Sequence, residues 1–217
     1  MLLIKKAKAD SKELLDPTSA VWGSIPASTL ALKGTPLGTQ PTSYTRGAFK
    51  GRKVGAVPSV QVRACHDGET VFVHLEWADA TENRGEADVI FPDGAAVVFP
   101  VGADAPINTM GNERQAVNAW QWRADASEGR SVVARGLGTS EATGDRVLTQ
   151  AARAGERWQV VIARDLAGVD PGNTSVALTP GGATRLGIAI WEGSNAERAG
   201  FKAYTENWTD AQLAAAN

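Results

Sequence analysis

The chain has 217 residues, of which 43% are hydrophobic and 21% charged, so it can bury a sizeable core and is not disordered over most of its length. Its 22 Lys plus Arg against 24 Asp plus Glu give a formal net charge of −2, which offers no general attraction for nucleic acid or anionic lipid. No apolar run approaches the ~20 residues of a membrane helix. Because Cys65 is the only cysteine, a disulfide within the chain, a Cys-ligated zinc site and an iron–sulfur cluster held by this chain alone are excluded.

Residues 1–56 form the first region of the chain. Pro, Gly, Ser and Thr interrupt its short apolar stretches, a pattern that predicts an irregular segment able to wrap a partner. The lysines near the N-terminus follow a very short apolar start, with no h-region or cleavage site, so the sequence does not predict a secretory signal.

Strand patterns dominate residues 57–217. A hairpin is predicted where two alternating segments, 57–65 and 70–77, flank a turn at residues 66–69, with one apolar face formed by Val71, Val73, Leu75 and Trp77. Further strand candidates bring the total to about ten: residues 87–91, 95–100, 118–124, 131–137, 145–152, 157–164, 184–192 and 201–208. The Ala-rich tail, residues 210–217, is expected to form a last helical turn or to fray.

These short strands, with no long amphipathic helix between them, predict an all-β, mainly antiparallel fold. We expect a β-sandwich with long loops and few short helices, forming one structural domain overall. Loops on such a scaffold are where function tends to lie.

Hydrolytic chemistry finds little support in the sequence. Both histidines lie in the predicted hairpin, His66 in the turn and His74 on the strand face opposite the apolar one, and no GxSxG elbow is present. A two-histidine metal site is also disfavoured, and we expect both side chains to be exposed. Cys65, at a strand end, is expected to be a small buried hydrophobic residue.

Two residue types are scarce. Beyond the initiator, Met110 is the one methionine, and it lies in a polar loop rather than in an apolar stretch, where it can present its thioether to a soft metal or haem iron. After position 53 the chain uses Arg for its positive charges, with Lys202 as the one exception. A desolvated amine can lose its proton and bind a metal, which a guanidinium cannot. The alternative for Lys202 is a solvated surface lysine.

Seven tryptophans are present, and Trp120 and Trp122 share one face of a predicted strand. Two interpretations stay open for this pair. Composition favours packing in the core, and the alternative is a stacking platform for a sugar or a planar cofactor.

Two segments, residues 99–125 and 188–208, carry the patterns MG-x5-VNAW-x-W and GSNAER-x-G-x-K-x-Y. They resemble the signature segments of the haem-binding gamma subunits of periplasmic molybdenum enzymes, heterotrimers of the dimethyl sulfoxide reductase family. That group includes the ethylbenzene, dimethyl sulfide and steroid side-chain dehydrogenases and the selenate and chlorate reductases, and the patterns look closest to the ethylbenzene dehydrogenase type.

The resemblance implies one non-covalent haem b with Met110 and Lys202 as axial ligands of the iron. It further implies an electron-transfer subunit without catalysis of its own, which serves an iron–sulfur beta subunit and an alpha subunit with the molybdenum cofactor, and an external carrier such as a soluble cytochrome. As a hypothesis, further residues line or support the cofactor pocket: Asn118, Trp120, Trp122, Asn195, Arg198 and Phe201. A periplasmic location, reached by export with a partner, is expected, with the cytoplasm as the alternative.

A competing prediction is a non-catalytic carbohydrate-binding β-sandwich module, since sandwiches host both functions. The feature that separates the two is the Met110 and Lys202 pair, which sugar binding does not need. A third possibility is a haem-free structural subunit that kept the fold.

Overall fold

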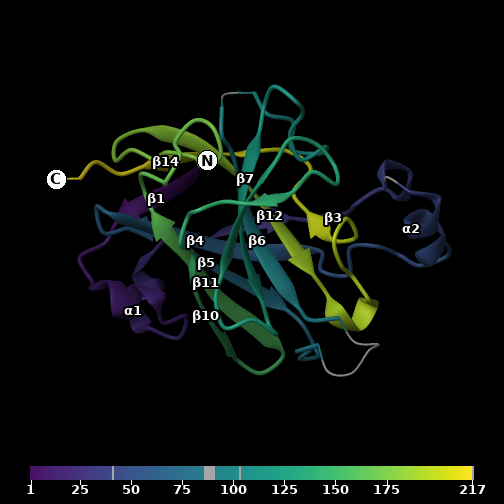
Figure 1. The fold of residues 1–217 in the computed structure, drawn as a ribbon. Helices are drawn as coiled ribbons and strands as arrows, with labels where there is room; N and C mark the ends of the chain where they lie inside the picture. The colour runs from purple at the N-terminus through teal and green to yellow at the C-terminus, as the bar shows by residue number, and fades with distance from the viewer. Residues whose placement is uncertain (41, 86–90, 103, 217) are drawn as a thin grey trace.

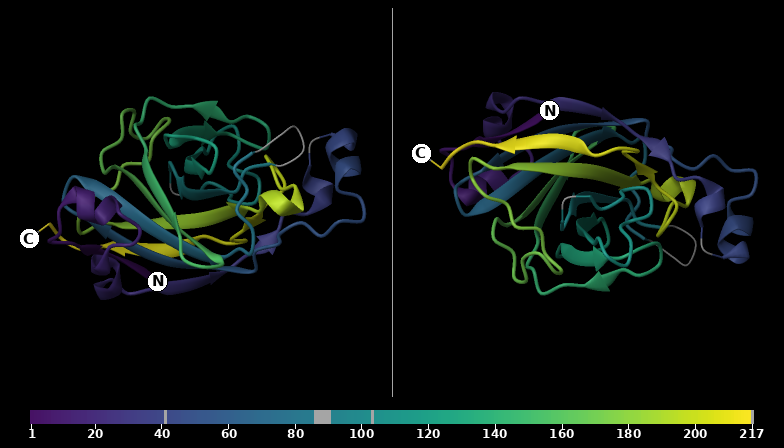
Figure 2. Two further views of the ribbon diagram at one scale, coloured as in Figure 1. Left: turned by 90° about the horizontal axis from the view of Figure 1, so that it is seen from below. Right: turned by 90° about the horizontal axis from the view of Figure 1, so that it is seen from above.

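The computed structural model describes residues 1–40, 42–85, 91–102 and 104–216, whose strands form the two layers of a β-sandwich. In Figure 2 the teal strands of the second layer lie over the blue strands of the first. The predicted strand at residues 87–91 falls mainly outside the described residues. No helix among the described residues is long and apolar enough to cross a bilayer.

The predicted hairpin forms the centre of the first layer (Figure 1). β4 (Ser59–His66) and β5 (Thr70–Ala78) pair antiparallel, and Asp67 closes their turn by accepting hydrogen bonds from the backbone N–H groups of Glu69 and Thr70 at 2.9 and 2.8 Å. The four apolar residues predicted to share a face all lie in the core: Val71, Val73, Leu75 and Trp77. Alternation therefore predicted both the hairpin and its buried side.

One long strand, β12 (Ala183–Trp191), takes part in both layers. Its first half pairs with β14 of the first layer, and its second half, from Gly187 onward, pairs with β6 of the second. The first layer runs in the order β10 (Leu148–Arg153), β11 (Arg157–Asp165), β5, β4, β1 (Leu2–Lys6), β14 (Thr209–Leu213) and β12, and β2 (Ser28–Ala31) pairs with β4. The second runs through β12, β6 (Gly94–Pro100), β7 (Val117–Arg123), β8 (Arg130–Ala134) and β9 (Glu141–Ala142).

Short helices and two-residue strands complete the fold. They are α1 (Ser11–Leu15), η1 (Ala20–Ser24), β3 (Lys33–Gly34), η2 (Leu37–Thr39), α2 (Ser43–Ala48), η3 (Gly193–Asn195) and β13 (Ala203–Tyr204). α2 stands at one end of the sandwich beside β3 (Figure 1). The all-β sandwich with few short helices is as predicted.

The N-terminal region is more regular than we predicted for residues 1–56. β1 lies between β4 and β14 and runs parallel to both, while β2 pairs with β4 and β3 with β13. In β1, Leu2 and Ile4 face the core and Leu3 is exposed. This alternation covers too few residues to predict a strand without the partner strands that lie far away in the sequence.

The C-terminal tail is likewise a strand, β14, and not the predicted helical turn. Ala211 and Leu213 face the core, and β14 pairs with β1 from the opposite end of the chain. Alanine favours helix locally, but the hydrogen-bond partners and the apolar surface supplied by β1 and β12 decide the conformation.

His66 and His74 are both buried, so the prediction that they are exposed is wrong. The two ends of the chain cover them: His74 Nε2 lies 3.1 Å from the carbonyl oxygen of Pro17, and His66 Nε2 lies 3.0 Å from that of Ala214. Burial lowers the pKa of both imidazoles and favours the neutral form. Cys65 is buried as predicted, and burial raises the pKa of its thiol to about 12.

Candidate functional site

A cleft on the outer face of the second layer is lined by both Met110 and Lys202. The cleft is open to solvent at its mouth. Val98 of β6 and Ala189 of β12 line its floor, because their neighbours in each strand point into the sandwich core. These small side chains leave room above the sheet. The two residues singled out by their scarcity therefore meet at one site, although 92 residues (202 − 110) separate them.

Met110 sits at the tip of a tight turn. Its N–H donates to the carbonyl of Ile107 at 3.1 Å, its carbonyl accepts from the N–H of Gly136 at 3.0 Å, and its backbone has a positive φ of 57°. Gly111 follows with a φ of 82°, and a Cβ there would lie 2.5 Å from the carbonyl oxygen of Gln115. The Met-Gly pair is thus fixed by a close approach that only glycine permits.

Lys202 is almost fully buried at the opposite wall. Its backbone is tied to Thr35, whose N–H donates to the Lys202 carbonyl at 3.0 Å. Among the described residues the side-chain amine makes no ion pair or hydrogen bond, and it lies 5.5 Å from the ring of Trp191. Burial lowers the pKa of this amine to about 8. The amine is therefore much easier to deprotonate than an ordinary lysine.

The N-terminal region forms part of the cleft wall, a role that we did not predict. Gln40 donates from Nε2 to the carbonyl of Gly200 at 3.1 Å, and Thr35 donates from Oγ1 to the same carbonyl at 2.6 Å. A Cβ at Gly200 would lie 2.1 Å from Gln40 Oε1. Gly200, two residues before Lys202, is the feature of the sequence that could have indicated this contact, since a glycine can mark the close approach of another segment.

Backbone strain gathers in the same two segments. Within the described ranges, three residues other than glycine have positive φ: Met110 at 57°, Ala196 at 57° and Ala199 at 48°. Each costs free energy of the order of 1 kcal/mol, and such strain is typical of functional sites. All three lie in the segments that present Met110 and Lys202.

Asn118, Trp120 and Trp122 do not line the cleft, and their role in supporting a haem pocket stays a prediction. Both indoles lie between the layers, and the Trp122 ring is 5.0 Å from the Trp158 ring. Trp120 donates from Nε1 to Asn118 Oδ1 at 2.8 Å, also inside the protein. Odd-numbered residues of β7, such as Ala119, face the cleft side instead. The core interpretation of the tryptophan pair is confirmed.

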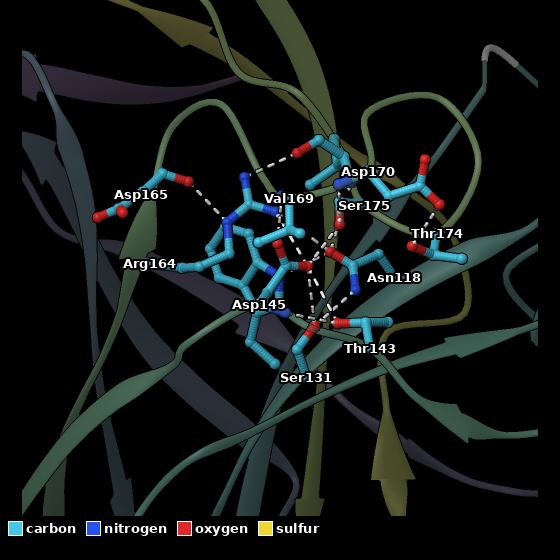
Figure 3. Close-up of polar contacts among 12 residues, drawn as sticks. Asn118, Ser131, Thr143, Asp145, Arg164, Asp165, Val169, Asp170, Thr174 and Ser175 are labelled. Atoms are coloured by element: carbon cyan, nitrogen blue, oxygen red, sulfur yellow. Dashed lines mark hydrogen bonds and ion pairs between the residues drawn. The ribbon is translucent and has the colours of Figure 1, made fainter.

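Asn118 belongs to a buried polar network, shown in Figure 3. The Arg164 guanidinium lies 3.8 Å from Asp145 Oδ2 and 4.5 Å from the centre of the Trp120 ring, and Ser175 donates to Asp145 at 2.6 Å. Burial raises the pKa of Asp145, but its hydrogen bonds and Arg164 outweigh that effect and lower it overall. Burial lowers the pKa of Arg164 to about 10. The network holds the loop after β11 against the second layer.

Asn195, Arg198 and Phe201 flank the cleft without lining it. Phe201 stacks on Phe49 at 3.9 Å between ring centres, and the Arg198 guanidinium lies 5.7 Å from the centre of the Phe49 ring. Asn195 donates from Nδ2 to the carbonyl of Lys53 at 3.0 Å. These contacts attach the N-terminal region to the segment that presents Lys202.

Comparison with known proteins gives concordant matches. The family model described as ethylbenzene dehydrogenase matches residues 19–153, a range that includes Met110. The chlorate reductase gamma subunit of Ideonella dechloratans is 34% identical over 95% of this chain and 82% of its own length. A protein named as the haem subunit of a respiratory nitrate reductase, from Haloferax mediterranei, is 33% identical over 88% of this chain, which spans 65% of its length. The dimethylsulfide dehydrogenase gamma subunit of Rhodovulum sulfidophilum is 26% identical over 91% of this chain and 75% of its own length.

Among solved structures, a family 9 carbohydrate binding module from Caldicellulosiruptor kristjanssonii, in complex with glucose, is similar in fold. The TM-score is 0.51 over 99% of this chain and 95% of that one, with 9% sequence identity. This likeness supports the β-sandwich architecture alone.

Proposed function

Since the chain belongs to the ethylbenzene dehydrogenase family, we propose that it is an electron-transfer subunit that binds one non-covalent b-type haem, with Met110 and Lys202 as the axial ligands. Relatives of this chain are gamma subunits of oxidoreductases, and it is itself a non-catalytic subunit of such a complex. The observation that carries the proposal is the presence of Met110 and Lys202 in one cleft.

The donor chemistry of the cleft suits haem iron. A thioether and a neutral amine are both good ligands for this metal, and when bound the haem supplies a one-electron redox couple. Two ligands from the protein leave no axial position for oxygen or substrate, which agrees with a subunit that transfers electrons only. With one cysteine in the chain, attachment through two thioethers is not available.

Lys202 has the more demanding role, because an amine must be neutral to donate its electron pair. Burial has already lowered its pKa to about 8, so loss of one proton from the ammonium group at neutral pH takes little free energy. Thr35 bonds to the carbonyls of Lys202 and Gly200, which fixes the backbone that presents the amine. Met110 needs no proton transfer, and its strained turn fixes the position of the thioether.

The proposal extends to the partners. Electrons would pass between this chain, an iron–sulfur beta subunit attached to an alpha subunit with the molybdenum cofactor, and an external carrier such as a soluble cytochrome. We also propose a periplasmic location, following the family resemblance, which cell fractionation would test. The substrate class of ethylbenzene or steroid side-chain type belongs to the alpha subunit.

The alternative of a carbohydrate-binding module has the fold likeness in its favour. Trp120 and Trp122, the pair that suggested a stacking platform, are buried between the layers and cannot reach a sugar from solvent. A haem-free structural subunit is distinguished from a cytochrome only by experiment.

The visible spectrum of the full chain with haem, oxidised and reduced with dithionite, tests the proposal. We expect a low-spin b-type spectrum in the wild type, and its loss or conversion to high-spin in Met110→Ala and Lys202→Ala. Lys33→Ala is the matched control, since Lys33 is an exposed lysine of β3, close to the cleft in the fold. No haem band in the wild type, or an unchanged spectrum in both ligand variants, would refute the ligand pair.

A further inference from the structure

Three acidic side chains meet at one end of the sandwich, outside the cleft. Asp79 directly follows β5, Asp93 directly precedes β6, and Glu192 directly follows β12. One carboxylate oxygen of each lies within 4.8 Å of the others. All three are buried, with exposed fractions of 4%, 0% and 7%. The group therefore joins the first layer, through Asp79, to the second.

Asp93 is held rigidly by donors. Its Oδ1 accepts from the N–H of Gly193 at 2.8 Å, and its Oδ2 accepts from the N–H of Asn83 at 2.8 Å and from Trp158 Nε1 at 3.1 Å. Such a set of neutral donors orients the ionised carboxylate but does not cancel its charge.

Glu192 is oriented in the same way, by Ser194. Its Oε1 accepts from the Ser194 hydroxyl at 2.8 Å and from the Ser194 N–H at 3.1 Å. Burial, reinforced by the charges of Asp79 and Asp93, raises the pKa of Glu192 to about 7. Three carboxylates this close are poorly stabilised without a counter-charge.

Asp79 supplies an independent observation. Its Oδ1 accepts from the N–H and the hydroxyl of Thr81, at 2.9 and 3.1 Å, but its Oδ2 is buried with no hydrogen-bond partner. An unpartnered buried polar atom is unfavourable by about 1–3 kcal/mol, and more when it is charged. One oxygen of this carboxylate lies within 4.8 Å of an oxygen of each of the other two, so a cation bound among them would give this incompletely bonded side chain a counter-charge.

Within the described ranges, no lysine or arginine side chain forms an ion pair with the group. Among the described residues, none of the three carboxylates has a Lys or Arg nitrogen within 4.0 Å. Arg153 is the nearby cation, but it donates from Nη2 to the backbone carbonyl of Asp79 at 2.7 Å, not to the carboxylate. A cation from solution would offset the charge.

We propose that Asp79, Asp93 and Glu192 bind one Ca²⁺ ion. Ca²⁺ takes oxygen ligands at about 2.4 Å, so ligand atoms up to about 4.8 Å apart fit around it without rearrangement, whereas Mg²⁺ at about 2.1 Å requires a tighter set. The site has no nitrogen or sulfur ligand for softer metals. The ion would join the two layers where the segment from Glu192 to Lys202 begins, and its binding does not depend on haem.

The full chain tests this directly. After dialysis against Ca²⁺, elemental analysis should find about one Ca²⁺ per chain, and Tb³⁺ used in its place should luminesce on tryptophan excitation because Trp158 contacts Asp93. Chelation with EDTA should lower the melting temperature, by about 5–10 °C relative to Ca²⁺ at a hundredfold excess over its Kd. Asp79→Asn and Glu192→Gln should abolish binding, while Asp104→Asn, at an exposed site, should not.

A different result is expected if the carboxylates share a proton instead. The wild type would then hold no metal and show no Tb³⁺ luminescence, and its melting temperature would be the same in Ca²⁺ and EDTA, which would overturn the proposal. Retention of Mg²⁺ or Mn²⁺ in place of Ca²⁺ would overturn it too. These measurements on the wild type decide the matter even where a variant fails to fold.

Discussion

The buried amine of Lys202 should make the haem-free chain less stable at neutral pH than a variant with an uncharged, unbranched side chain of similar length. Burial lowers the pKa of Lys202 from 10.5 to about 8, which corresponds to about 3 kcal/mol of unfavourable free energy for the charged form. Lys202→Met removes the charge and keeps an unbranched side chain that is one heavy atom shorter. We therefore expect this variant to gain up to about 3 kcal/mol in free energy of unfolding at pH 7.

The pH dependence follows from proton linkage. Below pH 8 the amine is protonated in both the folded and the unfolded chain, so the penalty is fully present in the wild type. Between about 8 and 10.5 the unfolded chain binds more protons than the folded one, so wild-type stability rises with pH relative to the variant. The advantage of Lys202→Met should fall to about zero near pH 10.5.

Urea denaturation of both proteins without haem, at pH values from 7 to 10, measures this difference. All other titrating groups are the same in the two proteins, so their contributions cancel in the difference between the two free energies of unfolding. Lys202→Arg is the matched control, because it stays charged and should not be stabilised, and Lys33→Met controls for loss of an exposed charge. A stability gain that does not change with pH, or a loss at pH 7, would refute the assignment of a charged, desolvated amine.

Three further predictions concern the cleft and the core. Haem affinity should fall about tenfold per pH unit below pH 8, because one proton on Lys202 competes with iron; a pH-independent titration would contradict this. Gly111→Ala should lower the free energy of unfolding by about 2–4 kcal/mol and weaken the low-spin spectrum through Met110. Gly138→Ala, at the same φ of 82° but with open space around its Cβ, should cost only the backbone strain of about 1 kcal/mol and leave the spectrum unchanged. Arg164→Met should lower the free energy of unfolding by about 3–5 kcal/mol, because it leaves the buried Asp145 carboxylate without its ion-pair partner. Urea denaturation measures the change.

Local patterns in the sequence determined the fold class. Alternation of side chains decides which face of a strand is buried, and this holds for β4 and β5 whatever their neighbours are. Met110 and Lys202 stood out because their residue types are scarce: one is a lone thioether in a polar loop, and the other is a lone amine where the chain otherwise uses arginine. Their scarcity indicated a chemical role for both. The structure adds that they share a cleft.

The remaining features depended on which distant segments pack together, and this is decided by the tertiary structure. β1 and β14 become strands because each supplies the other with hydrogen-bond partners across nearly the whole chain. Packing of the N-terminal region against the sheets also buries His74 beneath Pro17, and it places Thr35 in the lining of the cleft. The sequence does not show that the strand of Asn118 directs its side chain into the core, toward Arg164.

The group formed by Asp79, Asp93 and Glu192 illustrates the difference most clearly. In the sequence these residues are ordinary acids, spread over more than a hundred positions at strand ends. Only the meeting of two sheets removes them from water and brings their oxygens within 4.8 Å of one another. Periodicity records whether a residue is buried, because burial repeats along an element; it does not record which residues are buried together, because that depends on contacts between elements that are distant in the chain.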